Sequence, residues 1–273
     1  MTFKILFLGD IAARPGRTAV QELLPNLREK LGVTAVIANG ENAAGGFGIS
    51  HAVAQEVYAA GVDVITLGDH TFDQKDMDIF LTQEKRIVRP INYPHGTPGR
   101  GFATYEIGGK KIGVFNVMGR VFMRDSLDCP FQASRAHMML HKLGEHYDAM
   151  IVDAHTEATS EIAALGHIWD GQASLVVGTH THIPTADTRI QPKGTAFQSD
   201  AGMCGYYESS LGMDFEAVIK RFERAGRFAM QPASGAGTLS GVLVEVSEEK
   251  DTKGLATAVR PIRVGGVLSQ TEE

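Results

Sequence analysis

Five apolar segments of this sequence run directly into side chains that commonly bind metal ions, and this repetition limits the fold more than any other feature. Segments with helical spacing of apolar residues separate most of them, as in a parallel α/β sheet, whose strand carboxyl ends open into one crevice. The five segments are FLGD, ending in Asp10; IANGEN, with Glu41 and Asn42; TLGDH, with Asp69 and His70; VDAH, ending in His155; and GTHTH, with His180 and His182.

These side chains offer three carboxylates, one amide and four imidazoles, which is the donor set that two divalent metal ions require. The mixture favours iron, manganese or zinc over calcium or an all-thiolate zinc site. The His180–His182 pair is a moderately specific signal of a metal site, because side chains at i and i+2 of an extended chain point the same way. Taken alone, Asp10 could be a turn residue and His70 a structural histidine. The recurrence of ligand-type residues at five strand ends favours a metal site.

The remaining histidines have no ligand-type residue beside them in an equivalent position. We expect them to face solvent or the core: His51, His95, His137, His141, His146 and His167.

The elements alternate along the chain without an internal repeat or a linker. Helices are expected at 18–32, 51–60 (capped by Ser50), 73–84, 135–147, 160–169 and 215–224. Strands are expected at 4–9, 34–38, 62–67, 86–90, 149–153, 174–178, 189–190 and 195–200, with hairpins at 102–117, turning at Gly108–Gly109, and at 241–246 with 255–264. This pattern predicts one α/β domain over residues 1–273, with helices outside and sheet inside.

Charge and composition exclude several classes of protein. The net charge is −6 with no basic run, which argues against a groove for nucleic acid. No apolar run reaches the length of about 18 residues that a membrane span needs. The 2 cysteines, Cys129 and Cys204, and the absence of a secretory leader predict a reduced, cytoplasmic protein. Bound cations would still allow an acidic protein to take an anionic substrate.

The strand-end residues resemble the calcineurin-like metallophosphoesterase superfamily, whose signature is D-x-H, G-D-x-x-D, G-N-H, H and G-H-x-H. The chain departs from it, because Ile11 and Ala12 follow Asp10, and Glu41 and Asn42 replace the second aspartate motif. These departures are similar to the YmdB-type family of bacterial phosphodiesterases. So are the strings GDIAARPGR, GENAAGGFGI, GDHTFD, IVRPINYP, MGRVFM, HTEATSE, GTHTHIPTADTRI and GTAFQSDAGM, which cover nearly the whole chain.

The resemblance implies a four-layer α-β-β-α sandwich and two metal ions. It places one ion on Asp10, Glu41, Asn42 and His182, and the other on Glu41, Asp69, His155 and His180, with Glu41 shared. It implies hydrolysis of cyclic nucleotides, 2′,3′-cyclic ones above all. A hydroxide shared by the metals would attack phosphorus, and His70 would donate a proton to the leaving oxygen. Iron or manganese is expected before zinc.

One residue departs from the YmdB-type pattern, which usually has asparagine where this chain has Asp69. An aspartate can still ligate such a metal, but it adds a negative charge to the site. We therefore expect tighter metal binding, weaker attraction of an anionic phosphodiester, and activation of water at higher pH.

Further residues are candidates for supporting roles. Arg14 and Arg120 could clamp phosphate oxygens, although an ordinary surface role explains each equally well. Asp153 and Thr179 are candidates for orienting the ligands. Two other functions stay open at this point: a phosphomonoesterase or 5′-nucleotidase on the same metals, and a regulatory nucleotide-binding protein with incidental catalysis. The expected partner is a small phosphodiester, and assembly into a homo-oligomer is compatible with the sequence.

Overall fold

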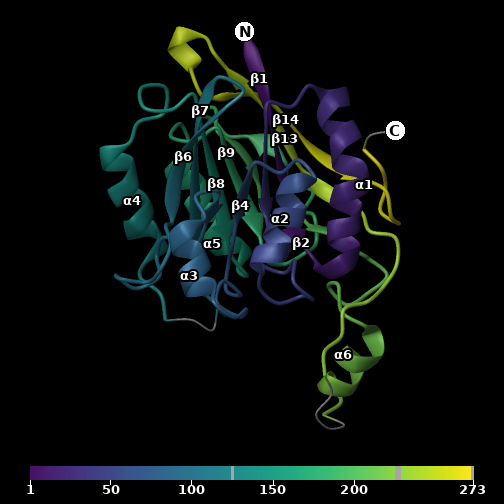
Figure 1. Ribbon diagram of the computed structural model, residues 1–273. Helices are drawn as coiled ribbons and strands as arrows, with labels where there is room; N and C mark the ends of the chain where they lie inside the picture. Colours follow the sequence, from purple (N-terminus) through teal and green to yellow (C-terminus); the bar gives the residue numbers. More distant parts are fainter. Residues whose placement is uncertain (124–125, 225–228, 272–273) are drawn as a thin grey trace.

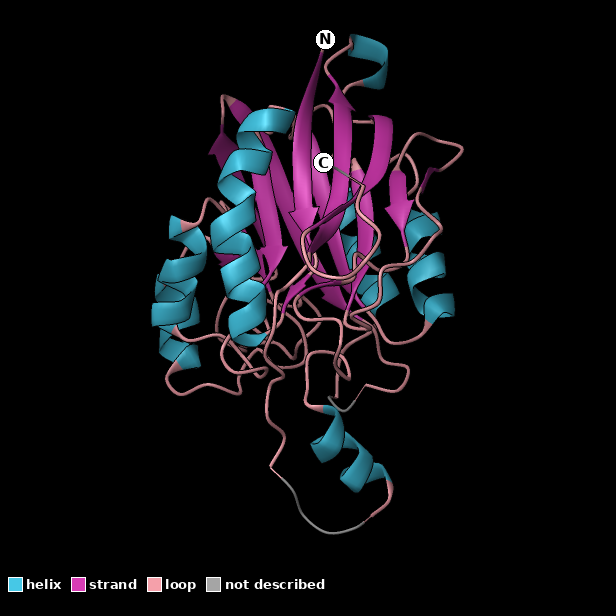
Figure 2. Cartoon of the chain, turned by 90° about the vertical axis from the view of Figure 1, so that its right-hand side faces the viewer, coloured by secondary structure: helices cyan, strands magenta, loops and turns pink. Residues whose placement is uncertain are grey.

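The computed structural model describes residues 1–123, 126–224 and 229–271. Two six-stranded sheets stack face to face, and helices cover their outer sides (Figures 1 and 2). The first sheet has the order β14 (Ala256–Val264), β13 (Leu239–Ser247), β1 (Thr2–Leu8), β3 (Ala35–Asn39), β4 (Val64–Thr66), β5 (Ile87–Val88). The second has the order β10 (Arg189–Ile190), β11 (Ala196–Gln198), β9 (Leu175–Thr179), β8 (Ala149–His155), β7 (Lys110–Met118), β6 (Phe102–Ile107).

Three apolar cores separate four layers. In β1, Leu6 and Leu8 face the core beneath helices α1 (Ala13–Leu31) and α2 (His51–Ala59), while Ile5 and Phe7 face the core between the two sheets. This alternation follows from the period of two along a strand that is buried on both faces. A third core lies between the second sheet and helices α4 (Pro130–Leu140) and α5 (Thr159–Trp169), with Trp169 at its centre. The predicted α-β-β-α sandwich is confirmed.

Four neighbouring strands run parallel in each sheet. In the first sheet β1, β3, β4 and β5 run parallel, and β13 and β14 add an antiparallel edge. In the second sheet β7, β8, β9 and β11 run parallel. A short parallel pair, β2 (Asp10–Ile11) with β12 (Met203–Cys204), ties the end of β1 to a distant segment. The carboxyl ends of the ligand-bearing strands therefore meet at one side of the molecule.

Local signals in the sequence account for several elements as expected. The hairpin of β6 and β7 turns at Gly108 and Gly109, whose φ angles of 57° and 73° suit a two-residue turn that needs left-handed residues. Ser50 caps α2, because its hydroxyl accepts a hydrogen bond from the backbone N–H of Val53.

Three predicted helices have wrong boundaries. Helix α1 begins at Ala13, five residues before the predicted start. Pro15 is tolerated in its first turn, because the N–H that proline lacks would have no partner within the helix at that position. Helix α4 covers Pro130–Leu140 instead of 135–147: Pro130 begins it, and Gly144, at φ 79°, lies in a left-handed conformation where a helix would have to continue. Helix α3 (Met77–Gln83) begins four residues late, because Asp73 bonds the His70 ring instead.

Helix α6 (Phe215–Phe222) stands away from the sandwich (Figures 1 and 2). Phe215, Ile219 and Phe222 are exposed on it.

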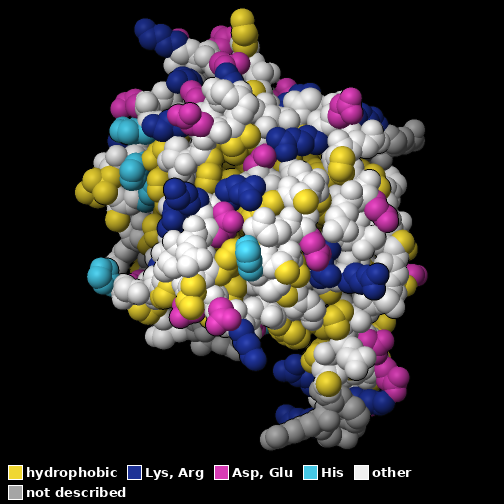
Figure 3. Space-filling view, in the orientation of Figure 1, with side chains coloured by type: hydrophobic (Ala, Val, Ile, Leu, Met, Phe, Trp, Pro, Cys, Tyr) yellow, Lys and Arg dark blue, Asp and Glu magenta, His cyan; other side chains and the backbone are white. Residues whose placement is uncertain are grey.

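On the face seen in Figure 3, Lys and Arg side chains are interspersed with Asp and Glu. Within the described ranges, every helix is too short or too polar to traverse a lipid bilayer.

Candidate metal centre

The structure brings the predicted strand-end residues together across both sheets. Asp10 follows β1, and the other first-sheet residues follow β3 and β4, whereas the histidines come from the ends of β8 and β9 in the second sheet. Since the two sheets are stacked, their carboxyl ends form adjacent walls of one site. The residues concerned are Asp10, Glu41, Asn42, Asp69, His155, His180 and His182.

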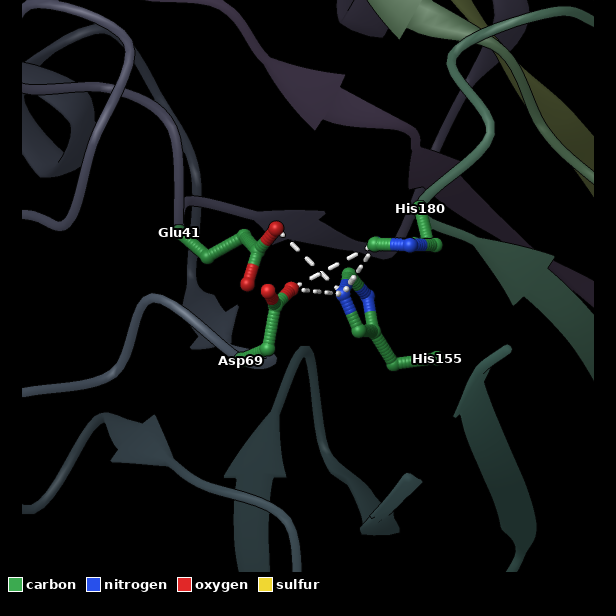
Figure 4. A group of neighbouring side chains, drawn as sticks. All are labelled: Glu41, Asp69, His155 and His180. Atoms are coloured by element: carbon green, nitrogen blue, oxygen red, sulfur yellow. Dashed lines mark hydrogen bonds and ion pairs between the residues drawn. The ribbon is translucent and has the colours of Figure 1, made fainter. Parts of the chain in front are cut away.

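Four of these side chains form a compact set (Figure 4). Ligand atoms of Glu41, Asp69, His155 and His180 all lie within 4.8 Å of one another. His155 Nε2 is 3.3 Å from Glu41 Oε1 and 3.2 Å from Asp69 Oδ1. His180 Nδ1 is 3.4 Å from Asp69 Oδ1 and 3.1 Å from His155 Nε2. Two carboxylates and two imidazole nitrogens thus converge on one point, as ligands of a metal ion do.

A second set of candidate ligands also contacts Glu41. The amide nitrogen of Asn42 is 2.9 Å from Glu41 Oε1 and 3.2 Å from His182 Nε2. His182 Nε2 is in turn 3.9 Å from Asp10 Oδ1. Glu41 therefore contacts both sets, which is the position required of a residue shared by two ions.

A buried network orients His155. Its Nδ1 lies 2.8 Å from the hydroxyl of Thr179, and that hydroxyl donates to Asp153 Oδ1 at 2.7 Å. The other Asp153 oxygen accepts from the amide of Asn39 at 3.1 Å and from the hydroxyl of Thr66. Because the Thr179 proton goes to Asp153, Thr179 accepts the Nδ1–H of His155, and Nε2 is the ring atom that faces the compact set. Asn39 and Thr66 are members that the sequence did not reveal.

The loop carrying His180 and His182 has an unusual backbone that other residues hold. Their φ angles are 102° and 66°, in the left-handed region that residues other than glycine rarely adopt. Between them, Thr181 donates both its backbone N–H and its hydroxyl to buried Asp200. The Leu211 carbonyl accepts from His182 Nδ1 at 3.0 Å, which leaves Nε2 facing Asp10. The backbone strain is thus confined to the two residues that carry the ligand atoms.

His70 lies beside the metal set. Its backbone N–H donates to Glu41 Oε2, its Nδ1 lies 2.6 Å from Asp73 Oδ2, and its ring meets Phe47 edge to face. Its Nε2 is 3.9 Å from Asp69 Oδ2. The ring is therefore held at one nitrogen, with the other directed to the site.

The charges of the site are strongly coupled. Burial raises the pKa of Asp10 to about 7, and Glu41 adds to this effect. Burial alone would lower the pKa of His155, but Glu41 and Asp69 raise it well above its ordinary value. Burial likewise would raise the pKa of Asp69, yet its hydrogen bonds to His155 and His180 lower it overall. Without a metal ion, a protonated His155 is the cation nearest to these carboxylates.

Two observations test whether metal ions fit these residues. Asp10 Oδ1 is buried and has no hydrogen-bond partner among the described residues, which is costly for a carboxylate unless a cation meets it. The Gly68 backbone approaches the compact set so closely that a Cβ there would lie 2.3 Å from His155 Nε2 and 2.4 Å from Glu41 Oε2, so only glycine lets these ligand atoms lie where they are. The unpaired oxygen, the close approach at Gly68 and the mixed N and O donors all fit divalent metal ions.

The two candidate arginines lie in different surroundings. Arg14, in the first turn of α1, lines a cavity of about 520 Å³ together with Pro15, Arg17 and Pro232. The backbone N–H of Arg120 donates to the carboxylate of Glu161. Neither observation assigns a phosphate to the guanidinium group, so both roles remain predictions.

Comparison with known proteins identifies the class. A sequence model described as YmdB-like protein matches residues 6–262. The 2′,3′-cyclic-nucleotide 2′-phosphodiesterase of Bacillus subtilis is 43% identical over 246 residues, 90% of this chain and 92% of that protein. Crystal structures of a hypothetical protein from Thermus thermophilus and of a phosphatase from Mycoplasma pneumoniae superpose with TM-scores of 0.88 each. Their identities are 40% and 33%, and the matches cover 97% of this chain and 100% and 94% of those chains.

Fold and site together define a metallophosphoesterase-type phosphoric ester hydrolase. Within that class the chain belongs to the YmdB-like family. The predicted resemblance is confirmed, whereas the role of each site residue remains to be tested.

Proposed function

We propose that this enzyme hydrolyses cyclic nucleotides, with 2′,3′-cyclic nucleotides as its substrates. The observation that carries the proposal is the convergence of two ligand sets that share Glu41. The name of the Bacillus subtilis relative supports the choice of substrate. The proposed partner is therefore a small phosphodiester.

The proposed ligands follow the two sets described above. Bound divalent ions would activate a water molecule as the nucleophile and neutralise charge on the phosphoryl oxygens. The donor chemistry favours iron or manganese over zinc. One ion would be held by Asp10, Glu41, Asn42 and His182, and the other by Glu41, Asp69, His155 and His180.

His70 is the proposed proton donor. Asp73 accepts the Nδ1–H and so keeps the ring oriented, with a proton on Nε2 available to the site. Departure of a ribose oxygen requires such a donor, because an alkoxide is a strongly basic leaving group. General acid assistance of this kind accelerates a reaction roughly 10²- to 10⁴-fold.

The proposed function also includes two arginines as phosphate contacts, a single domain and a cytoplasmic location. Arg14 and Arg120 are proposed phosphate contacts, since a guanidinium group can bond two phosphate oxygens at once. The shared core between the sheets supports one domain over the chain, of which residues 124–125, 225–228 and 272–273 lie outside the described part. The free cysteines Cys129 and Cys204 support a cytoplasmic location.

The test is hydrolysis of 2′,3′-cyclic AMP by manganese-loaded protein, with 3′,5′-cyclic AMP and 5′-AMP as competing substrates. H70A should lose roughly 10²- to 10⁴-fold in kcat while keeping its metal. H167A, which changes an exposed histidine on α5, is the matched control and should behave as the unchanged enzyme. Turnover of 5′-AMP alone would instead support a phosphomonoesterase. Metal and nucleotide binding without turnover would support a regulatory binding protein.

A further inference from the structure

Glu157 contacts His180 on the side of the ring that faces away from the compact metal set. Its Oε2 lies 3.2 Å from His180 Nε2, and its side chain is 48% exposed. The residue belongs to the short connection between β8, which ends at His155, and α5, which begins at Thr159. The other nitrogen of the same ring, Nδ1, faces Asp69 and His155.

The backbone of His180 is already fixed without Glu157. Its N–H donates to Asp10 Oδ2 at 3.1 Å, and the next residue, Thr181, is held by Asp200. The imidazole ring is less constrained, since it is 23% exposed, whereas that of His155 is fully buried. Glu157 can therefore determine two features of His180: the rotation of its ring and the ring nitrogen that carries the proton.

The two histidines of the compact set have different supports on their outer nitrogens. His155 Nδ1 meets a neutral hydroxyl, that of Thr179, whereas His180 Nε2 meets the carboxylate of Glu157. A carboxylate that accepts a ring N–H fixes the tautomer and makes the opposite nitrogen a stronger ligand. A carboxylate at the edge of a site for an anionic phosphodiester would otherwise repel the substrate. Its position is therefore better explained by His180 than by substrate.

We propose that Glu157 is a positioning residue, which keeps the His180 proton on Nε2 and directs the Nδ1 lone pair to the metal ion of the compact set. This inference rests on the metal site of the proposed function. It adds a residue outside the seven candidate ligands, one that acts on metal affinity through His180.

The test is a metal titration of the full-length protein with manganese, by calorimetry and by counting retained ions after gel filtration. E157A should weaken the binding of one of the two ions by about 10- to 100-fold and leave the other unchanged. E157Q should lose less, because its amide oxygen still accepts the N–H but carries no charge. E216Q, which changes an exposed glutamate paired with Lys220 on α6, is the matched control.

A double-mutant comparison assigns the effect to His180. In an H180A background, E157A should cause no further loss of metal affinity. At saturating manganese, E157A should recover most of its kcat with an unchanged KM for 2′,3′-cyclic AMP.

Three results would overturn the inference. Unchanged metal affinity in E157A would exclude the positioning role. A raised KM at unchanged metal affinity would make Glu157 a substrate contact. An equal loss of affinity in the H180A background would show that it does not act through His180. If the unchanged protein retained no metal at all, the proposed function itself would fail; two retained ions with any of the other results would overturn this inference alone.

Discussion

The Nδ1 atom of His70 lies 2.6 Å from a carboxylate oxygen of Asp73, and both residues belong to the connection between β4 and α3. The Asp73 side chain is 44% exposed, so the pair is at the rim of the site. A hydrogen bond of this kind orients an imidazole and determines which of its nitrogens faces the site. Asp73 should therefore influence catalysis through His70.

We expect D73N to reduce kcat for 2′,3′-cyclic AMP on the order of tenfold, less than the loss in H70A. The loss should nearly disappear with bis(p-nitrophenyl) phosphate, because a nitrophenolate departs without a proton. Steady-state kinetics on the two substrates measures the difference.

D78N, an exposed change in the first turn of α3, is the control for D73N and should leave both rates unaltered. Equal losses of D73N on the two substrates would contradict a role in proton donation. They would indicate instead that Asp73 supports the structure of the loop.

The metal-free protein should become less stable as the pH rises. The folded-state pKa of Asp10 is about 7, above its ordinary value of 3.8, so the folded state binds this proton more tightly than the unfolded state. The free energy of unfolding therefore falls between about pH 4 and pH 7. His155 acts in the same direction: its pKa is raised on folding, so its contribution is lost as the pH rises through the folded value.

Urea unfolding in EDTA at pH 5.5 and pH 8 should show a loss on the order of 2 kcal/mol from Asp10 alone. D10N should show a smaller loss, and manganese should restore more stability at pH 8 than at pH 5.5. Equal losses in D10N and the unchanged protein would contradict the raised pKa of Asp10, because other groups, such as His137 with its lowered pKa, contribute equally to both proteins.

The sequence reveals the candidate ligands because each stands within two or three residues of an apolar strand. The end of a parallel strand is a local feature, and strands of this kind share one open edge. Asp69 and His70 after β4, or His180 after β9, can thus be located without tertiary information. The contact between Asp73 and His70 is local in the same way, since the two residues are three positions apart. Glu157 instead contacts His180, which follows a different strand, so this contact needs the tertiary structure.

Asp153 and Thr179 are support residues that the sequence offers as candidates, but the other supports of the site could not be predicted in the same way. Asn39 and Asp153 meet through a hydrogen bond that spans 114 positions, and Asp200 reaches Thr181 across 19. No local pattern distinguishes Asn39 and Asp200 from ordinary buried polar side chains. Their partners are determined by the stacking of two sheets and by the β2–β12 pair, which are tertiary features.

Gly68 should be essential for metal binding although it offers no ligand. A Cβ at this position would overlap His155 Nε2 and Glu41 Oε2. We expect G68A to displace these two side chains and to lose the ion of the compact set, with a fall in kcat of at least about 100-fold. The count of manganese ions per chain, taken beside the far-ultraviolet circular dichroism spectrum, measures this. A folded G68A protein with two ions and full activity would contradict the proposed location.

Asp69 should raise the pH at which the enzyme works. With Asp10 and Glu41 it would offset three of the four positive charges of two divalent ions, which leaves less charge to attract a phosphodiester or to activate water. D69N should therefore shift the alkaline-leaning pH–rate profile to lower pH by about one unit and lower KM for the anionic substrate. It should also weaken metal binding by about 10- to 100-fold, so the rates must be compared at saturating manganese. D78N supplies the control for removal of a carboxylate elsewhere on the chain. A D69N profile that coincides with that of the unchanged enzyme would show that the charge of Asp69 does not determine the working pH.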